Sequence, residues 1–330
     1  MRRSLAVLLL LAACTHPSGP APTPTSGAFP TPTLTLTYDV TPQTGAPYQQ
    51  SIDLDRPYRA RVRTFGTGVA GTITTEHGVY TITAGGIQLA QETYPARPGA
   101  DSYLDVALPV LASQGLVRRD GAGTVLGTPC TWWVSQAPLE SVPVRPGSSD
   151  AHTRSCVDAD GLVLRSEETV AGRLALTRVL VKRERTRELS SEALFGGPAP
   201  TGGAGVLRVK VLDAPPSPPL AVTARPPGSG WAFASGAVFA TLGAGGAAES
   251  NGDRTVYVRD GRLAVLEEYQ RLDAPTAPPT EGEELPDGGR LTAGYDGLTL
   301  TRYTRSGVLV RLIGHLTRAE VLAWDQALAG

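Results

Sequence analysis

The chain has 330 residues and a formal net charge of −1 at pH 7, which excludes the basic footprint of a nucleic-acid-binding protein. Its 38 glycines and 28 prolines favour many short strands and turns over long helices. The length leaves room for two domains.

The first residues have the features of an export signal that ends in a cysteine. Arginines precede an apolar run over residues 5–13, much shorter than the ~20 residues that a membrane-spanning helix needs. The run ends in Leu-Ala-Ala-Cys, which resembles a bacterial lipobox. That resemblance implies a signal peptide over 1–13 and lipidation of Cys14, whereas the alternative is an ordinary signal with a chance cysteine. We therefore expect an extracytoplasmic protein, anchored by lipid to the cell membrane or outer membrane.

Residues 14–33 predict a disordered tether. The segment is rich in proline and nearly devoid of large apolar side chains, so burial cannot offset the cost of ordering it.

A helix is predicted over residues 101–113. Leu104, Leu108 and Leu111 lie on one face at helical spacing, and Pro109 is expected to kink or shorten the helix. Plain core packing is the simpler interpretation of this stripe.

Two adjacent tryptophans, Trp132 and Trp133, lie in a predicted strand. Successive side chains of a strand point to opposite faces, so one tryptophan can fill the core while the other faces a groove or a helix. The alternative is that both pack in structural layers.

The cysteines Cys130 and Cys156 remain once Cys14 is assigned to lipid. An even pair in an exported chain predicts a disulfide. Two free thiols or half of a metal site are the alternatives, although neither cysteine has a further ligand at metal-binding spacing.

Turn dipeptides divide the rest of the chain into hairpins. They are expected over 161–185, 254–272 and 297–316, with turns at Ala171-Gly172, Asp260-Gly261 and Ser306-Gly307. The Gly/Pro-rich stretch 196–205 predicts a linker between a domain over 34–195 and a smaller one over 206–330. A capping box from Thr317 to Glu320 predicts a C-terminal helix.

The search for catalytic and cofactor motifs finds little. Residues 66–71 match G-x-G-x-x-G, but a strand-like segment follows instead of the helix that phosphate binding needs. Residues 158–161 resemble the start of a calcium loop, but Thr169 stands where the bidentate Glu belongs, so a tight turn is expected. We expect no enzyme, cofactor or metal, although distant residues can still assemble a catalytic site.

Several motifs together resemble the bacterial LolA-like superfamily and its RseB/MucB regulators. They are "PYRARVRTF", "TTEHGVYTI", "GTVLGTPCTWWVSQ" and "CVDADGLVLRSEETVAGRLALTRVLV", followed by "TVYVRDGRLAVLEEYQ" in the second block. The resemblance implies an α+β fold that is mostly antiparallel β: a LolA-like half-barrel over 34–195, then a smaller antiparallel sheet domain with a C-terminal helix. Residues 34–56 depart from the pattern, because strand and loop stand where these families usually begin with an amphipathic helix.

The resemblance also implies a function. The first hypothesis is a tethered, non-enzymatic binding or regulatory module that senses envelope state through an acyl lipid or a membrane-bound regulatory protein. The second is a lipid or lipoprotein carrier, and the third is an enzyme or a purely structural envelope protein. An acyl groove is expected between the first sheet and the 101–113 helix, and its candidate lining residues are Leu104, Leu108, Leu111 and one of Trp132 and Trp133.

Overall fold

The computed structural model describes residues 33–56, 58–66, 69–94, 104–136, 150–186, 189–201, 205–216, 230–272, 280–294, 297–304 and 307–329. The lipidation predicted at Cys14 and the tether predicted over 14–33 rest on sequence that lies outside these residues, apart from Thr33, and they stay predictions.

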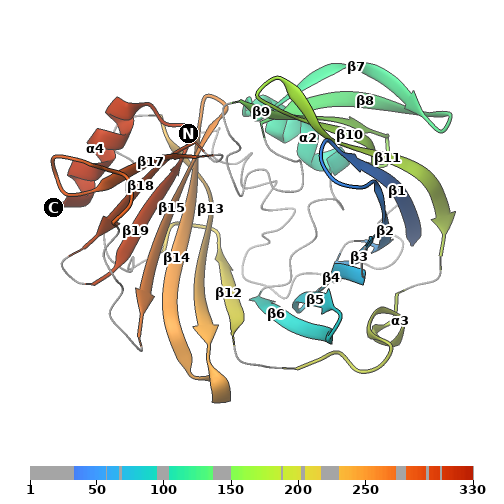
Figure 1. Cartoon of the computed structure of the whole chain (residues 1–330), viewed down its shortest axis with the longest axis horizontal. Coiled ribbons are helices and arrows are strands. Elements are labelled where there is room, and N and C mark those ends of the chain that lie inside the picture. Colours follow the sequence, from blue (N-terminus) through green and yellow to red (C-terminus); the bar gives the residue numbers. More distant parts are fainter. Residues whose placement is uncertain are drawn as a thin grey trace.

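The described residues of the first half form a curved antiparallel sheet and two helices (Figure 1). Its strands are β1 (Leu34–Pro42), β2 (Tyr48–Asp55), β3 (Arg59–Phe65), β4 (Val69–Thr75), β5 (Gly78–Thr83), β6 (Gly86–Tyr94), β7 (Val117–Val125), β8 (Thr128–Ser135), β9 (Ala151–Val157), β10 (Val163–Val170) and β11 (Arg173–Arg185). The helices are α2 (Leu104–Ser113) and α3 (Ser191–Phe195). Side by side, the strands run β7-β8-β9-β10-β11-β1-β2-β3-β4-β5-β6.

The second half continues the same sheet. Its elements are β12 (Val206–Leu212), β13 (Ala232–Leu242), a 3-10 turn (Ala244–Gly246), β14 (Ala248–Arg259), β15 (Arg262–Arg271), β16 (Glu283–Glu284), β17 (Arg290–Gly294), β18 (Gly297–Tyr303), β19 (Leu309–Gly314) and α4 (Arg318–Ala329). Their order is β12-β13-β14-β15-β19-β18-β17-β16. The predicted α+β class, mostly antiparallel, is confirmed.

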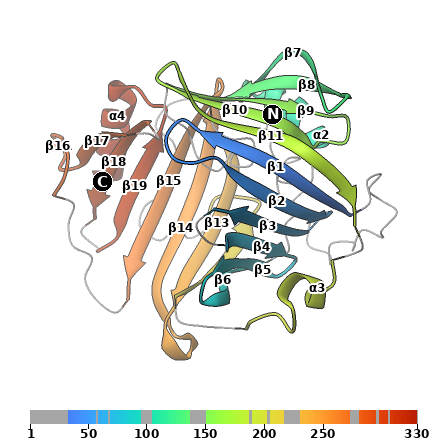
Figure 2. The same cartoon turned by 45° about the vertical axis from the view of Figure 1, so that its right-hand side comes forward.

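The two halves join along a parallel strand pair. β12 pairs with β6 from Leu207–Gln91 to Lys210–Tyr94, which makes one sheet of 19 described strands. In Figures 1 and 2 the two curved portions lie on either side of this seam. The linker predicted over 196–205 directly precedes β12, and the two-domain division stays a prediction.

Helix α2 makes a second connection between the halves. Its buried residues share one core cluster with Val163 of the first half and with Val256 and Leu263 of the second. Gly115 follows the last residue of the helix, Ser113, by two positions, and its φ of +71° is the left-handed conformation usual after a helix. The Cα of Gly261, in the β14–β15 turn, lies close enough that a Cβ built on Gly115 would meet it at 3.4 Å. The helix is therefore packed between both halves.

The predicted hairpins and the capping box are present, and Ser306 of the third predicted turn lies outside the described residues. β10–β11, β14–β15 and β18–β19 are antiparallel hairpins with the expected partners, and β3 and β4 pair across the glycine-rich loop. In the α4 capping box, the Glu320 carboxylate accepts from Thr317 N at 2.8 Å, and Glu320 N donates to Thr317 Oγ1 at 3.2 Å. Trp324, 1 % exposed, packs behind it in the core of the second half.

Candidate functional site

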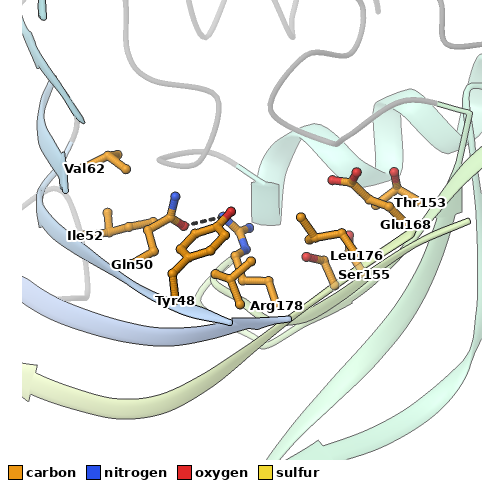
Figure 3. Close-up of a pocket in the computed structure, with 11 residues that line it drawn as sticks. Tyr48, Gln50, Ile52, Val62, Thr153, Ser155, Glu168, Leu176 and Arg178 are labelled. Atoms are coloured by element: carbon orange, nitrogen blue, oxygen red, sulfur yellow. Dashed lines mark hydrogen bonds between the residues drawn. The ribbon is translucent and has the colours of Figure 1, made fainter. Parts of the chain in front are cut away.

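A cavity of about 380 Å³ lies on the face of the first sheet formed by β3, β2, β1, β11, β10 and β9. Figure 3 shows its lining side chains standing on the sheet on the side where α2 lies. Binding pockets for small ligands typically measure roughly 300–1,000 Å³, so the cavity is of the size that a ligand uses.

Strand register places residues from distant parts of the chain in one row of this face. Ser155 pairs with Ser166, Ser166 with Arg178, Arg178 with Val40, and Val40 with Tyr48. Cross-strand partners lie about 4.5–5.5 Å apart at Cβ, so the row forms a continuous surface. The cavity is built by strand pairing, not by a local motif.

One end of the cavity is apolar. Ile52 and Val62 are cross-strand partners on β2 and β3, and Leu176 and Val40 extend the apolar surface toward β11 and β1. These side chains belong to, or pack against, the core cluster of the first half.

The other end carries buried hydroxyl groups. Thr153, Ser155 and Ser166 are 5 %, 2 % and 6 % exposed and line the cavity. None of the three hydroxyls hydrogen-bonds another residue in the described part of the chain. These hydroxyls can therefore donate to, or accept from, a polar group that enters the cavity.

Two charged side chains flank the hydroxyls. Nη1 of Arg178 donates to Oε1 of Gln50 at 3.3 Å, and its guanidinium lies 4.9 Å from the centre of the Tyr38 ring. Tyr38 is itself fixed, since its hydroxyl donates to the carbonyl oxygen of Val163 at 2.7 Å. Glu168, the cross-strand partner of Thr153, lines the opposite end.

A second cavity, of about 450 Å³, lies along the β6–β12 seam, and Tyr80, Tyr94 and Pro200 help to line it. Its charged residues Glu92 and Arg208 are already paired at 2.8 Å. The first cavity is therefore the better candidate, because its polar groups include hydroxyls without partners among the described residues.

The structure places the three predicted groove leucines in a packed core. Leu104, Leu108 and Leu111 are 1 %, 3 % and 2 % exposed. They belong to the cluster that contains Ala234, Val256, Val258, Leu263 and Val265 of the second half. Sequence reasoning found the apolar face of the helix but not its partner, because contacts with β13–β15 are invisible to local periodicity. The acyl groove beside α2 stays a prediction, and the cavity described above has a different lining.

The two tryptophans lie on opposite faces, as expected. Trp133 packs against the α2 cluster, whereas Trp132 packs against the cluster that contains the disulfide, with the Arg154 guanidinium 4.1 Å from its ring centre.

The predicted disulfide is present. Cys130 on β8 and Cys156 on β9 are bonded, with their Cα atoms 5.4 Å apart and exposures of 7 % and 0 %. Gly123 on β7 lies so close that an added Cβ would stand 3.0 Å from the Cys156 sulfur. The bond is therefore buried between strands, and it anchors the β7–β9 edge.

The tight turn expected at residues 158–161 is also confirmed. Oδ1 of Asp158 accepts from the backbone nitrogens of Asp160 and Leu162, and Arg183 pairs with both aspartates at 3.1 and 3.0 Å. Burial raises the pKa of the Asp158 carboxyl above its usual value, partly opposed by the hydrogen bond from Leu162 and the nearby Arg183 charge. These contacts satisfy the carboxylates within the protein.

Sequence reasoning missed Ser155, Ser166, Glu168 and Arg178. The alternation of side chains along the 161–185 hairpin could have indicated them. Ser166 and Glu168 lie on one face of the first strand, and their cross-strand partners Arg178 and Leu176 lie on the same face of the second. Which face points inward, however, depends on pairing with β1 and β9, and the sequence does not show that register.

Among the described residues, each helix is too short or too polar to cross a membrane. The same residues contain no group of three or more His, Cys, Asp or Glu side chains placed to hold a metal ion.

Comparisons with known proteins give structural likeness only. No protein-family model and no curated protein sequence matches the chain. The MucA/MucB complex of Pseudomonas aeruginosa is similar at 14 % identity and a TM-score of 0.46, over 100 % of this chain and 97 % of the other. A second structure, MucB in complex with MucA(peri), gives 13 % identity and a TM-score of 0.42, over 90 % of this chain and 92 % of the other.

A LolA superfamily protein from Nitrosomonas europaea is similar at 10 % identity and a TM-score of 0.25, over 50 % of this chain and 91 % of the other. The solved structures that this chain resembles thus include the two groups that its sequence motifs resemble, at similarity too low to carry an argument about function.

Proposed function

We propose that this protein is a lipid-anchored extracytoplasmic module that binds an amphiphile on its first sheet and regulates a membrane-bound protein partner. It has no catalytic role in this proposal. The lipid anchor follows from the lipobox-like end of the signal at Cys14, and the class of partner follows from the sequence resemblance to RseB/MucB regulators.

One observation carries the binding part of the proposal. The cavity joins an apolar end at Ile52 and Val62 to a polar end whose buried hydroxyls have no partner among the described residues. An apolar tail gains about 0.8 kcal/mol for each CH₂ group that it buries, and a polar head supplies the missing hydrogen bonds. An amphiphile satisfies both ends at once.

Native mass spectrometry of the full mature chain, purified from membranes, tests this proposal. We expect a co-purified amphiphile of discrete mass that dissociates on activation. Leu176→Trp, which fills the cavity, is expected to abolish the adduct. Thr177→Trp is the matched control, because the adjacent side chain of β11 points to the other face.

The result needs one further comparison. Circular dichroism should show that both tryptophan variants fold. An adduct that survives Leu176→Trp but is lost in Leu108→Trp places the ligand in the groove beside α2, and an adduct-free wild-type chain contradicts amphiphile binding.

A carrier is the second candidate function, and the same cavity favours it. Transfer of a labelled amphiphile between donor and acceptor vesicles separates the two functions. A carrier is expected to speed transfer in proportion to its concentration. A regulator instead retains the ligand and changes its affinity for a membrane protein, which crosslinking in native membranes detects.

A further inference from the structure

We propose that the proline-rich segment at residues 20–24 of the tether docks into the second cavity, the one along the β6–β12 seam. The occupant is therefore part of this chain, and residues 25–32 connect it to β1. This site is separate from the cavity to which we assign the amphiphile, and the inference does not depend on amphiphile binding.

The second cavity presents tyrosine rings and apolar side chains to its occupant. Tyr80 and Tyr94 line it from β5 and β6, and Pro200 and Val209 also line it. Tyr94 is 73 % exposed, more than any other large hydrophobic side chain in the described part of the chain. Tyr80 is held in place, because its ring lies edge-on to that of Phe195 with the ring centres 4.7 Å apart. The cavity thus offers one fixed and one exposed aromatic ring.

The charges of this cavity favour an uncharged occupant. The Glu92 carboxylate and the Arg208 guanidinium lie on paired residues of β6 and β12 and contact each other at 2.8 Å. Residues 20–24, Pro-Ala-Pro-Thr-Pro, carry no charge. Docking of this segment therefore leaves the ion pair intact.

The segment has the chemistry that aromatic grooves recognise. Three of its five residues are proline, which fixes φ near −65° and favours the polyproline II conformation before binding. Little conformational entropy is then lost on docking, and the proline rings pack against aromatic side chains. The hydroxyl of Tyr94 can donate to a carbonyl oxygen of the segment. A proline-rich segment and a tyrosine-lined cavity are therefore complementary.

The last residue of the tether lies close to a stretch of chain that leads to the cavity. The carbonyl oxygen of Thr33 accepts a hydrogen bond from the backbone nitrogen of Thr186 at 2.9 Å. Pro200, in the cavity wall, follows Thr186 by 14 residues, and α3 lies between them. Figure 2 shows α3 beside β5, in agreement with their shared core cluster. A short segment of this chain thus already joins the tether to the cavity.

The length of the tether matches the distance to the cavity. Strand register places Thr33 and Tyr94 at the same end of the β1–β6 strands, five strand spacings apart, about 24 Å along the sheet. The eight residues 25–32 span about 25 Å in the polyproline conformation. Residues 20–24 therefore reach the cavity, while residues 14–19 lead on to the predicted anchor.

Docking shortens the part of the tether that remains free. Residues 14–32 span about 60 Å when extended, whereas residues 14–19 alone span about 20 Å. The docked state keeps the β6–β12 seam near the membrane to which Cys14 is predicted to be attached. It thereby determines which side of the protein faces a membrane-bound partner.

Photocrosslinking in the full mature chain, purified in detergent micelles, tests the proposal. Benzoylphenylalanine is placed at Thr25, next to the docked segment, and peptide mass spectrometry maps the crosslinked products. We expect products within one chain at residues 93–94 and 199–201, which line the cavity.

A pair of variants in the folded part assigns these products to the cavity. Tyr94→Ala is expected to lower their yield by up to about tenfold, the effect of one aromatic contact. Leu126→Ala is the matched control and is expected to leave the yield unchanged. It removes another exposed hydrophobic side chain, 60 % exposed, from the β7–β8 turn.

A pair of tether variants assigns the products to residues 20–24. Glycine at all three of Pro20, Pro22 and Pro24 removes the preference for the polyproline conformation and is expected to abolish most of the product. The control replaces the same number of prolines outside the docked segment and is expected to keep the product; its changes are Pro17→Gly, Pro30→Gly and Pro32→Gly.

Other outcomes contradict the proposal. Products spread over the surface, products in the first cavity, or an unchanged yield in Tyr94→Ala overturn docking in the second cavity. Products between two chains, recognised by mixing isotopically light and heavy protein, assign the cavity to a second copy and overturn it too. If Tyr94→Ala does not fold, the two proline variants decide alone, because their changes lie in the tether. The amphiphile adduct is measured separately, so failure of one proposal is distinguishable from failure of the other.

Discussion

Replacing Gly261 with alanine is expected to loosen the contact between the two halves of the molecule. Gly261 lies in the β14–β15 turn at φ +74°, and an added Cβ would stand 2.5 Å from the backbone oxygen of Gly115, just after α2. Because that oxygen belongs to the backbone, the helix end or the turn must move.

The chain offers a matched control for this change. Gly172 occupies the same place in the β10–β11 turn, at φ +72°, and an added Cβ there meets nothing within 4 Å. Both alanine variants bear the cost of the left-handed conformation, about 1–2 kcal/mol. Gly261→Ala bears in addition a steric cost of about 1–3 kcal/mol, as in overpacked cores. We therefore expect Gly261→Ala to lower the free energy of unfolding by about 2–5 kcal/mol in total.

Urea denaturation followed by tryptophan fluorescence measures the difference between the two variants. Hydrogen exchange locates it: amide protection in α2 is expected to fall in Gly261→Ala and to remain in Gly172→Ala. Equal destabilisation of both variants, with α2 equally protected, would refute a close contact between Gly115 and Gly261.

Three further predictions concern the anchor, the disulfide and an ion pair. Metabolic labelling with a fatty-acid analogue is expected to mark the wild type and to fail in Cys14→Ser; equal labelling would contradict the lipobox assignment. Replacing both Cys130 and Cys156 with serine is expected to cost about 3 kcal/mol by the chain-entropy argument, and unchanged thermal unfolding would count against it. The hydrogen bond from Arg59 lowers the pKa of Glu76, so this pair stabilises the fold above the unfolded pKa of about 4.5 and loses its contribution as pH falls through the lower, folded value. Glu76→Gln is accordingly expected to cost up to about 1 kcal/mol at pH 7 and little at acidic pH, and a loss independent of pH would contradict the ion pair.

Turns, helix caps and side-chain orientation in a strand could be predicted from the sequence, because each depends on only a few neighbouring residues. The Asp260-Gly261 turn sets the β14–β15 register, because both residues adopt the positive φ that such a hairpin turn needs. The capping box at Thr317 fixes the start of α4. The opposite orientation of Trp132 and Trp133 follows from strand geometry alone.

Contacts between distant segments were not predictable in this way. The helical periodicity of α2 identifies its apolar face but does not say which segment covers that face. In the structure the covering residues include Val256 and Leu263 of the second half. The cavity was missed for the same reason. Ser166 and Arg178 become neighbours of Val40 only after β11 pairs with β1, more than a hundred residues apart in sequence.

The parallel pairing of β6 with β12 has a consequence for how the chain can be divided. Each of these strands covers the hydrogen-bonding edge of the other, from Leu207–Gln91 to Lys210–Tyr94. Either half produced alone leaves its strand of this seam, β6 or β12, with unpaired N–H and C=O groups, and exposed edges recruit strands from other molecules. The seam thus protects against edge-to-edge aggregation, a protection that each half provides for the other only when both are present.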